Sequence, residues 1–203
     1  MSSTTKLEVI VLVFDGFELL DLFGPIELLS FLDEVRFRYV SEFGGSIKNK
    51  VGLKLDTEKM TLGETCDILL IPGGQGTRKV YLQPSFIDYV KSYAENATYV
   101  LSVCTGAVLL SETGLLNGRR ATSNKRSFNW VSSTNAKVDW VRQARWVVDG
   151  KYYTSSGVSA GMDMVLGFIS DQFGQNKAKD IAHKIEYHWQ SDCNKDDFAR
   201  RLQ

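Results

Sequence analysis

Residues 98–116, TYVLSVCTGAVLLSETGLL, change from an apolar, strand-like run to a helical pattern at a single cysteine, Cys104. The run TYVLSV predicts a buried strand, and the residues after Cys104 have helical spacing, with Gly106 near the start. A sharp turn from a strand into a helix pushes one side chain out at the carboxyl edge of a sheet, where open α/β sheets usually bind ligands. The stretch therefore predicts a parallel α/β sheet with Cys104 at its ligand-binding edge.

Apolar runs alternate with helical patterns along the rest of the chain, which predicts an open, mostly parallel sheet with helices on both faces. Further strands are predicted at residues 7–14, 36–43 and 66–71, a hairpin at 138–157, and helices at 19–32, 85–96, 125–133, 159–173 and 176–190. Gly24-Pro25 should interrupt or kink the first helix, and Ser159 should be the N-cap of the helix that begins there. Asp149-Gly150 should form the hairpin turn. No repeat or linker is visible, so residues 1–203 are expected to form one domain.

Composition excludes several classes of protein. The chain carries 24 basic and 24 acidic side chains, so it has no electrostatic footprint for nucleic acid or an anionic membrane. No apolar run reaches the roughly 20 residues that cross a bilayer, and the N-terminus does not read as a signal peptide. Because the chain ends soon after the last predicted helix, we expect no DNA-binding domain. We expect a cytoplasmic protein that acts on a small molecule.

The cysteines and histidines argue against a disulfide framework and against a metal site. Three widely spaced cysteines fit a reducing compartment, and Cys66 and Cys193 are expected to be structural. There is no CxxC motif, and His183 and His188 are five residues apart in a predicted helix, so they do not share a face. No cofactor or metal is expected.

Cys104 has two interpretations. In the first, Cys104 is a small, buried hydrophobic residue, which is the commoner role of a cysteine whose position in the fold is unknown. A cysteine between a strand and a helix instead meets the partial positive charge and free N–H groups of the helix N-terminus. These should lower the pKa of the thiol. The position favours a reactive Cys104, with Gly106 allowing a substrate or another segment to approach closely.

Two further segments are candidates for the same site. In the loop at residues 72–76, PGGQG, the glycines can turn backbone N–H groups toward a pocket as an oxyanion hole requires, although a tight surface turn explains the loop as well. Glu18 and Asp21 are one helical turn apart, and Asp21 lies within an apolar pattern. Asp21 is therefore either a cap or a buried acid with a raised pKa and a chemical task.

The chain resembles the DJ-1/PfpI superfamily, most of all its isonitrile (isocyanide) hydratase branch. Five segments carry the resemblance: FDGFELLDLFGPIELL, IPGGQGT, SVCTGAVLLSETGLLNGRRATSN, SSGVSAGMD and IEYHW. The resemblance implies a flavodoxin-like fold similar to class I glutamine amidotransferases, and a homodimer. It also implies Cys104 as the nucleophile with Thr105 beside it, Asp21 as the acid, and backbone donors at Gly73, Gly74 and Thr105. Glu18, Gly106 and Asn124 are expected near the pocket.

The chain departs from the peptidases of this superfamily, which carry Cys-His where this chain has Cys104-Thr105. Asn124 stands where similar branches often have a histidine. Losing the histidine removes the usual base of a Cys–His mechanism, which argues against peptidase activity.

Three functions remain open. The first is hydration of an isocyanide to an N-substituted formamide by Cys104, with Asp21 as acid and base and Thr105 orienting Asp21 or the water. The second is a glyoxalase-type conversion of methylglyoxal to lactate at the same site. The third is non-catalytic: redox sensing in a stress response through an exposed, low-pKa Cys104 thiolate.

Overall fold

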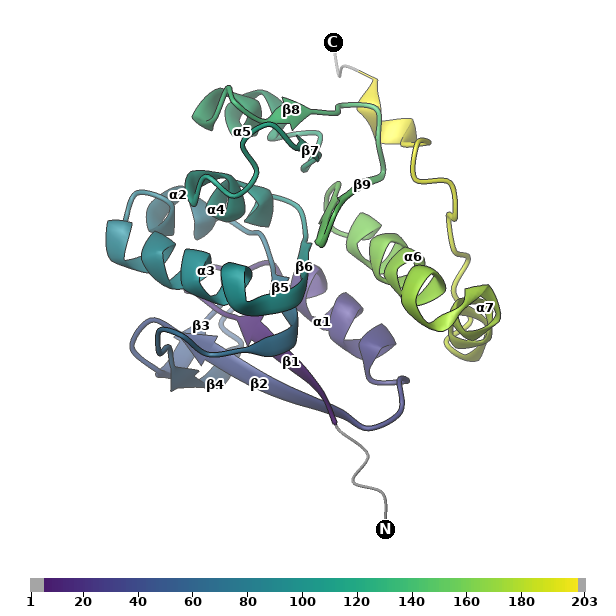
Figure 1. The fold of residues 1–203 in the computed structure, drawn as a ribbon, viewed down its shortest axis with the longest axis horizontal. Coiled ribbons are helices and arrows are strands. Elements are labelled where there is room, and N and C mark those ends of the chain that lie inside the picture. Colours follow the sequence, from purple (N-terminus) through teal and green to yellow (C-terminus); the bar gives the residue numbers. More distant parts are fainter. Residues whose placement is uncertain (1–5, 201–203) are drawn as a thin grey trace.

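An eight-stranded sheet forms the centre of the protein, for which the computed structural model describes residues 6–200 (Figure 1). Its strand order is β3-β4-β2-β1-β5-β6-β10-β9, and β7 pairs with β8 in a separate two-stranded sheet. The strands are β1 (Leu7–Leu12), β2 (Val35–Ser41), β3 (Gly45–Lys48), β4 (Lys54–Lys59), β5 (Cys66–Ile71), β6 (Ala97–Ser102), β7 (Arg120–Ala121), β8 (Asp139–Trp140), β9 (Trp146–Asp149) and β10 (Tyr152–Ser155). Pairing is parallel from β4 through β2, β1, β5 and β6 to β10, and antiparallel at both edges.

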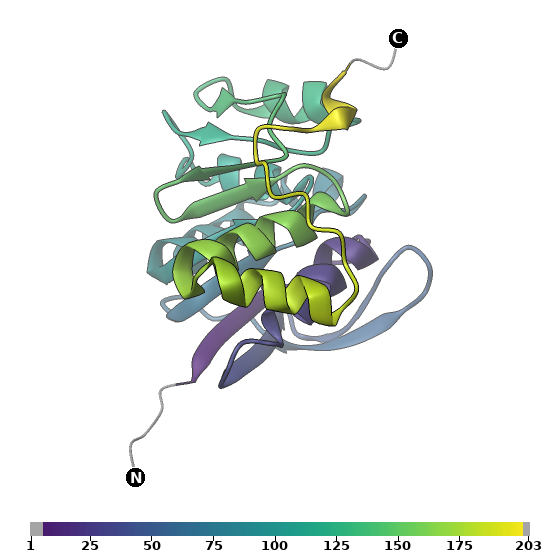
Figure 2. The same ribbon diagram turned by 90° about the vertical axis from the view of Figure 1, so that its right-hand side faces the viewer.

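Helices cover both faces of the sheet, which confirms the flavodoxin-like α/β fold. α1, α6 and α7 lie on one face, and α2, α3 and α4 lie on the other (Figures 1 and 2). The helices are α1 (Leu19–Leu29), α2 (Thr77–Val80), α3 (Pro84–Asn96), α4 (Gly106–Glu112), α5 (Phe128–Thr134), α6 (Ala160–Phe173) and α7 (Gln175–Lys184), followed by a 3-10 turn η1 (Asp197–Ala199). Within residues 6–200, no helix is long and apolar enough to cross a membrane.

The three central strands bring the candidate site residues to one end of the sheet. β1 and β5 are buried along their last four residues, and β6 along its last three, so these strands form the core of the sheet. Parallel strands share their carboxyl edge. The loops after β1, β5 and β6, which carry Asp21, Gly73 and Cys104, therefore meet there.

Several predicted elements differ in detail. The segment 138–157 was expected to be a single hairpin, but only β9 and β10 form it, because β8 pairs in parallel with β7. β3 and β4 were not predicted. The final helix ends at Lys184, so His188 lies outside it, where the sequence predicted a helix through residue 190.

The helix α1 is not interrupted at Gly24-Pro25, and Ser159 occupies the predicted N-cap position of α6 without a side-chain cap hydrogen bond. α1 runs through Gly24-Pro25 without interruption, and Gly24 packs closely on the Met162 side chain of α6, which holds this part of the helix in place. Ser159 makes no side-chain cap of α6. Its hydroxyl instead accepts a 3.3 Å hydrogen bond from Arg145, because that buried guanidinium needs acceptors.

The segment that follows α7 crosses the end of the sheet and is fixed by buried ion pairs (Figure 2). Asp163 of α6 accepts from Arg145 at 2.6 Å and from the Gln190 N–H at 3.0 Å. Lys125 lies 3.6 Å from Asp196. These contacts attach the C-terminal segment to the loop that contains Asn124 and Lys125.

Candidate active site

Cys104 occupies a strained turn between β6 and α4. Its φ is +59°, a left-handed conformation that costs a non-glycine residue about 1–2 kcal/mol. The cysteine N–H donates to Ser156 O at 3.2 Å, and the cysteine carbonyl accepts from the Ser123 hydroxyl at 2.6 Å. Both backbone groups are therefore held, which fixes the direction of the thiol.

Gly106 permits this turn and does not line the cavity. A Cβ at Gly106 would lie 2.6 Å from the Ile71 carbonyl oxygen, so only glycine lets α4 start against the end of β5. The sequence analysis allowed either a substrate or another segment of the chain to lie close to Gly106. In the structure it is another segment of the chain. The expected pocket position of Gly106 is corrected accordingly, because backbone atoms already fill the space beside it.

Asp21 lies buried in the first turn of α1 and neighbours the Cys104 thiol. Its Oδ2 accepts a 3.0 Å hydrogen bond from the Gly73 N–H, while Oδ1 has no hydrogen-bond partner within the described residues. Burial raises the pKa of Asp21 to about 7, and the Glu18 carboxylate adds to this rise. Of the two interpretations of Asp21, the structure therefore has the buried acid with a raised pKa.

The pKa of Cys104 shifts in the direction opposite to the expected one. Burial raises the pKa of the thiol, and the negative charge of Asp21 raises it further. The N–H groups of Thr105 and Val158 face the sulfur and lower the pKa of the thiol, but the effect of burial on this pKa is larger. Both shifts favour the protonated thiol beside the Asp21 carboxyl group. This state disfavours the redox-sensor alternative, which requires an exposed thiolate.

The N–H groups of Gly73 and Gly74 are directed at protein side chains and not at the cavity. Gly73 donates to Asp21, and Gly74 donates to the Thr105 hydroxyl at 3.0 Å. The expectation of two free oxyanion donors is therefore corrected, because both N–H groups already have acceptors within the chain. A Cβ at Gly73 would lie 2.6 Å from Thr105 N and 2.9 Å from Asp21 Oδ2, so this glycine lets the three segments meet.

Thr105 fastens the glycine loop to α4. Its hydroxyl lies 3.0 Å from Gly74 N, 3.3 Å from Gly74 O and 3.1 Å from the Thr77 hydroxyl of α2. The predicted contact of this hydroxyl with Asp21 is not among its hydrogen bonds within the described residues. Thr105 therefore positions the loop, while its backbone N–H faces the sulfur.

A cavity of about 420 Å³ opens above the sulfur. Among the residues predicted for the site, it is lined by Glu18, Gly74, Cys104, Thr105 and Asn124. Asn124 accepts from the Ser127 N–H at 3.1 Å through its side-chain oxygen, and this bond shapes the turn beside the cavity.

The cavity is also lined by Val158 and by residues that the sequence analysis did not predict there: Lys50, Gln75, Arg78, Arg126 and Ser127. Val158 has a φ of +52°, rare for a β-branched residue, and this brings its N–H toward Cys104 and Asp21. The glycine of SSGVSAG signals a tight turn, but only the fold shows that the turn meets Cys104. The cations carried no sequence motif.

The arrangement suits addition of a thiol to an electrophilic carbon with an aspartic acid as the proton carrier. No histidine lines the Cys104 cavity, since His183 and His188 line a different hollow beside α7. Within residues 6–200, no three His, Cys, Asp or Glu side chains gather as metal ligands would. The chemistry therefore rests on a thiol, a carboxyl group with a pKa of about 7, and backbone N–H groups.

Comparisons with known proteins agree with this geometry. Residues 7–171 match the DJ-1/PfpI family. The chain is 31% identical over 184 residues to the isonitrile hydratase of Pseudomonas putida, which covers 89% of this chain and 78% of that protein. It is also 31% identical over 154 residues to a deglycase of Thermococcus kodakarensis, covering 73% of this chain and 89% of that protein.

Among solved structures, a ThiJ/PfpI family protein from Pseudomonas syringae superposes with a TM-score of 0.79 at 25% identity, covering 90% of this chain and 76% of that chain. Sequence and structure relatives therefore agree on the family, whereas the named relatives differ in the reaction they catalyse.

Proposed function

The chain belongs to the DJ-1/PfpI family, and we propose that it hydrates an isocyanide to an N-substituted formamide. The observation that carries the proposal is the Asp21 carboxyl, with a pKa of about 7, beside the buried Cys104 thiol in a cavity without histidine. The similarity to an isonitrile hydratase over most of both chains supports the same reaction.

The first half of the reaction joins the sulfur to the isocyanide carbon. Asp21, as a carboxylate, accepts the thiol proton while Cys104 attacks the terminal carbon of R–N≡C. The proton then passes to that carbon, which gives the thioimidate R–N=CH–S–Cys104. The N–H groups of Thr105 and Val158 stabilise the negative charge that develops on sulfur during the transfer.

The second half consumes one water. Asp21, again a carboxylate, removes a proton from the water as its oxygen adds to the thioimidate carbon, and the proton goes to nitrogen. The C–S bond of R–NH–CH(OH)–S–Cys104 then breaks, and the hydroxyl proton returns to sulfur. The product is R–NH–CHO, and the site is restored with no net gain or loss of protons.

The test is incubation with a simple alkyl isocyanide while the formamide is followed by NMR. We expect product with the wild type and with Cys193→Ser, a control at a half-buried cysteine outside the cavity, and none with Cys104→Ala. Mass spectrometry should detect the thioimidate as an adduct on Cys104. No product with the wild type, or undiminished product with Cys104→Ala, contradicts the proposal. Lactate formation from methylglyoxal would point to the glyoxalase-type alternative.

A further inference from the structure

The mouth of the Cys104 cavity carries more positive than negative charge. Its charged lining consists of Lys50, Arg78, Arg126 and Glu18. Lys50 pairs with Glu18 at 2.6 Å, so these two charges offset each other. Within residues 6–200, neither Arg78 nor Arg126 has a carboxylate within 4.0 Å. Two guanidinium groups at the cavity are therefore without an anionic partner.

Arg78 is held by stacking and not by an ion pair. Its guanidinium carbon lies 3.9 Å from the centre of the Trp130 ring. Trp130 is in turn held by the edge of Tyr81, at 5.7 Å between ring centres. Stacking occupies the flat face of a guanidinium and leaves the N–H groups in its plane free to bind a carboxylate in a bidentate manner. The stack thus preorganises Arg78 for an anion.

Arg126 lies two residues after Asn124, in the turn that leads into α5. The hydrogen bond from Ser127 N–H to Asn124 fixes this turn, and Asn124, Arg126 and Ser127 all line the cavity. Arg78 lies in α2, just after the glycine loop that follows β5, whereas Arg126 lies much later in the chain, just before α5. The two cations therefore reach the cavity from separate elements.

We propose that the cavity selects isocyanides that carry a carboxylate, with the isocyanide carbon at Cys104 and the carboxylate bound by Arg78 and Arg126. This inference rests on the proposed hydration. A volume of about 420 Å³ accommodates a small isocyano acid. The unpaired cations provide charge complementarity, and no unpaired carboxylate among the lining residues opposes it.

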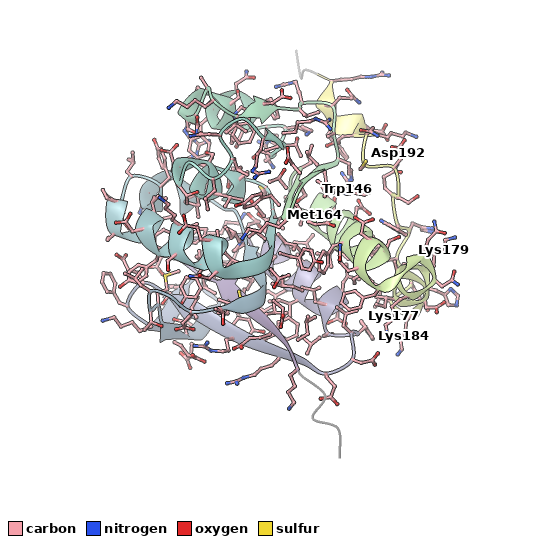
Figure 3. The ribbon with its side chains drawn as sticks, in the orientation of Figure 1. Trp146, Met164, Lys177, Lys179, Lys184 and Asp192 are labelled. Carbon is pink, nitrogen blue, oxygen red and sulfur yellow. The ribbon has the colours of Figure 1, made fainter. Side chains whose placement is uncertain are left out.

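The test compares two substrates that differ only in charge, 2-isocyanoacetate and 2-isocyanoacetamide. We expect the wild type to favour the carboxylate in kcat/KM by at least about tenfold, mainly through a lower KM, with the preference shrinking as salt rises. Arg78→Gln/Arg126→Gln should abolish the preference while hydration of the amide continues. The control Arg36→Gln/Lys179→Gln removes two exposed charges away from the cavity and should keep it; Figure 3 places Lys179 on α7.

Binding of the two products separates this inference from the proposed function. Calorimetry with N-formylglycinate and N-formylglycinamide needs no turnover. Preferential binding of the carboxylate that is lost in the Arg78→Gln/Arg126→Gln variant supports the inference even if neither isocyanide is hydrated, an outcome that would contradict only the proposed reaction. Equal turnover of the two substrates with equal or no binding of the two products overturns the inference and leaves hydration standing.

Discussion

The N–H of Gly73 donates a 3.0 Å hydrogen bond to Oδ2 of Asp21, and this bond joins the loop after β5 to the first turn of α1. The carbonyl of the same glycine accepts from the Glu18 N–H at 2.9 Å. One residue thus fixes both the acid and the backbone that carries it. Within the described residues, Asp21 Oδ1 has no further hydrogen-bond donor of normal geometry, and the carboxyl group neighbours the Cys104 thiol, where a proton carrier is needed.

Replacing Gly73 should disturb this junction. The methyl group of Gly73→Ala would meet Thr105 N at 2.6 Å and Asp21 Oδ2 at 2.9 Å, so the segments must separate. We expect hydration to fall by at least about tenfold and stability by about 1–3 kcal/mol, measured by steady-state kinetics and denaturant unfolding. Gly24→Ala is the matched control, because its methyl meets side chains and not backbone: the flexible Met162 at 2.8 Å and Leu20 at 3.5 Å. Equal effects of the two variants would argue against a special role for Gly73.

Asp21→Asn should remove the acid while leaving the fold intact. The amide oxygen can still accept from Gly73, but the side chain no longer carries a proton to and from the substrate. We expect kcat to fall by about 100-fold or more, with the protein folded by circular dichroism. The wild-type pH–rate profile should change slope near pH 7, the pKa of Asp21, and that slope should vanish in the variant. A variant as active as the wild type would remove Asp21 from the mechanism.

Asp21 should also make stability depend on pH. Its pKa rises from 3.8 to about 7 on folding, so the folded state holds the proton more tightly than the unfolded state. The wild type should therefore lose stability relative to Asp21→Asn as pH rises from about 4 to about 7, by up to about 1.4 kcal/mol per pH unit. Parallel urea titrations of both proteins over this range measure the difference. A constant difference across the range would mean that Asp21 is not perturbed by burial.

Thr105→Val should show how much the hydroxyl that fastens the glycine loop contributes to stability and turnover. The change leaves the Gly74 N–H without its acceptor, which costs about 1–3 kcal/mol in a buried site, while the Thr77 hydroxyl keeps its 2.7 Å bond to the Gly74 carbonyl. Hydration should fall because the loop loosens around Asp21. Thr105→Ser keeps the hydroxyl and should recover most of both losses, whereas a serine variant as impaired as the valine variant would assign the effect to the methyl group. Thermal unfolding and turnover measure the two effects.

Peroxide should not select Cys104 in the resting protein. Its thiol is buried and its pKa is raised, whereas Cys193 is partly exposed. Oxidation follows thiolate character and access, so we expect Cys193 to be modified at least as readily as Cys104. Peptide mass spectrometry after mild treatment gives the order. Selective oxidation of Cys104 would restore the redox-sensing alternative.

The local sequence pattern was sufficient to predict the core strands of the fold. The apolar runs predicted β1 and β6 within two residues and the whole of β5, because strands buried on both faces read as continuous apolar segments. β3 and β4 were not predicted because their residues are mostly exposed, with one large apolar side chain in each strand, and their pairing depends on a hairpin at the sheet edge.

The neighbouring positions of Cys104 and Asp21 could be predicted from the sequence, whereas the electrostatics of the site and much of the cavity lining could not. Cys104 and Asp21 are indicated by their motifs, and the resemblance pairs them. The direction of the Cys104 pKa shift depends on how completely the Val158 turn and α1 cover the sulfur, and tertiary packing decides that. Arg78 and Arg126 lie in separate segments without a motif, so only the fold brings both to the cavity.

The left-handed backbone of Cys104 and Val158 sets stability against activity in this protein. Each residue occupies a conformation that glycine adopts without cost, so glycine at either position would relax the turn. Relief of this strain favours glycine in place of Cys104, whereas turnover requires the sulfur. An engineering campaign that ranks variants by melting temperature should hold both positions fixed, since the most stable descendants would include proteins that no longer react.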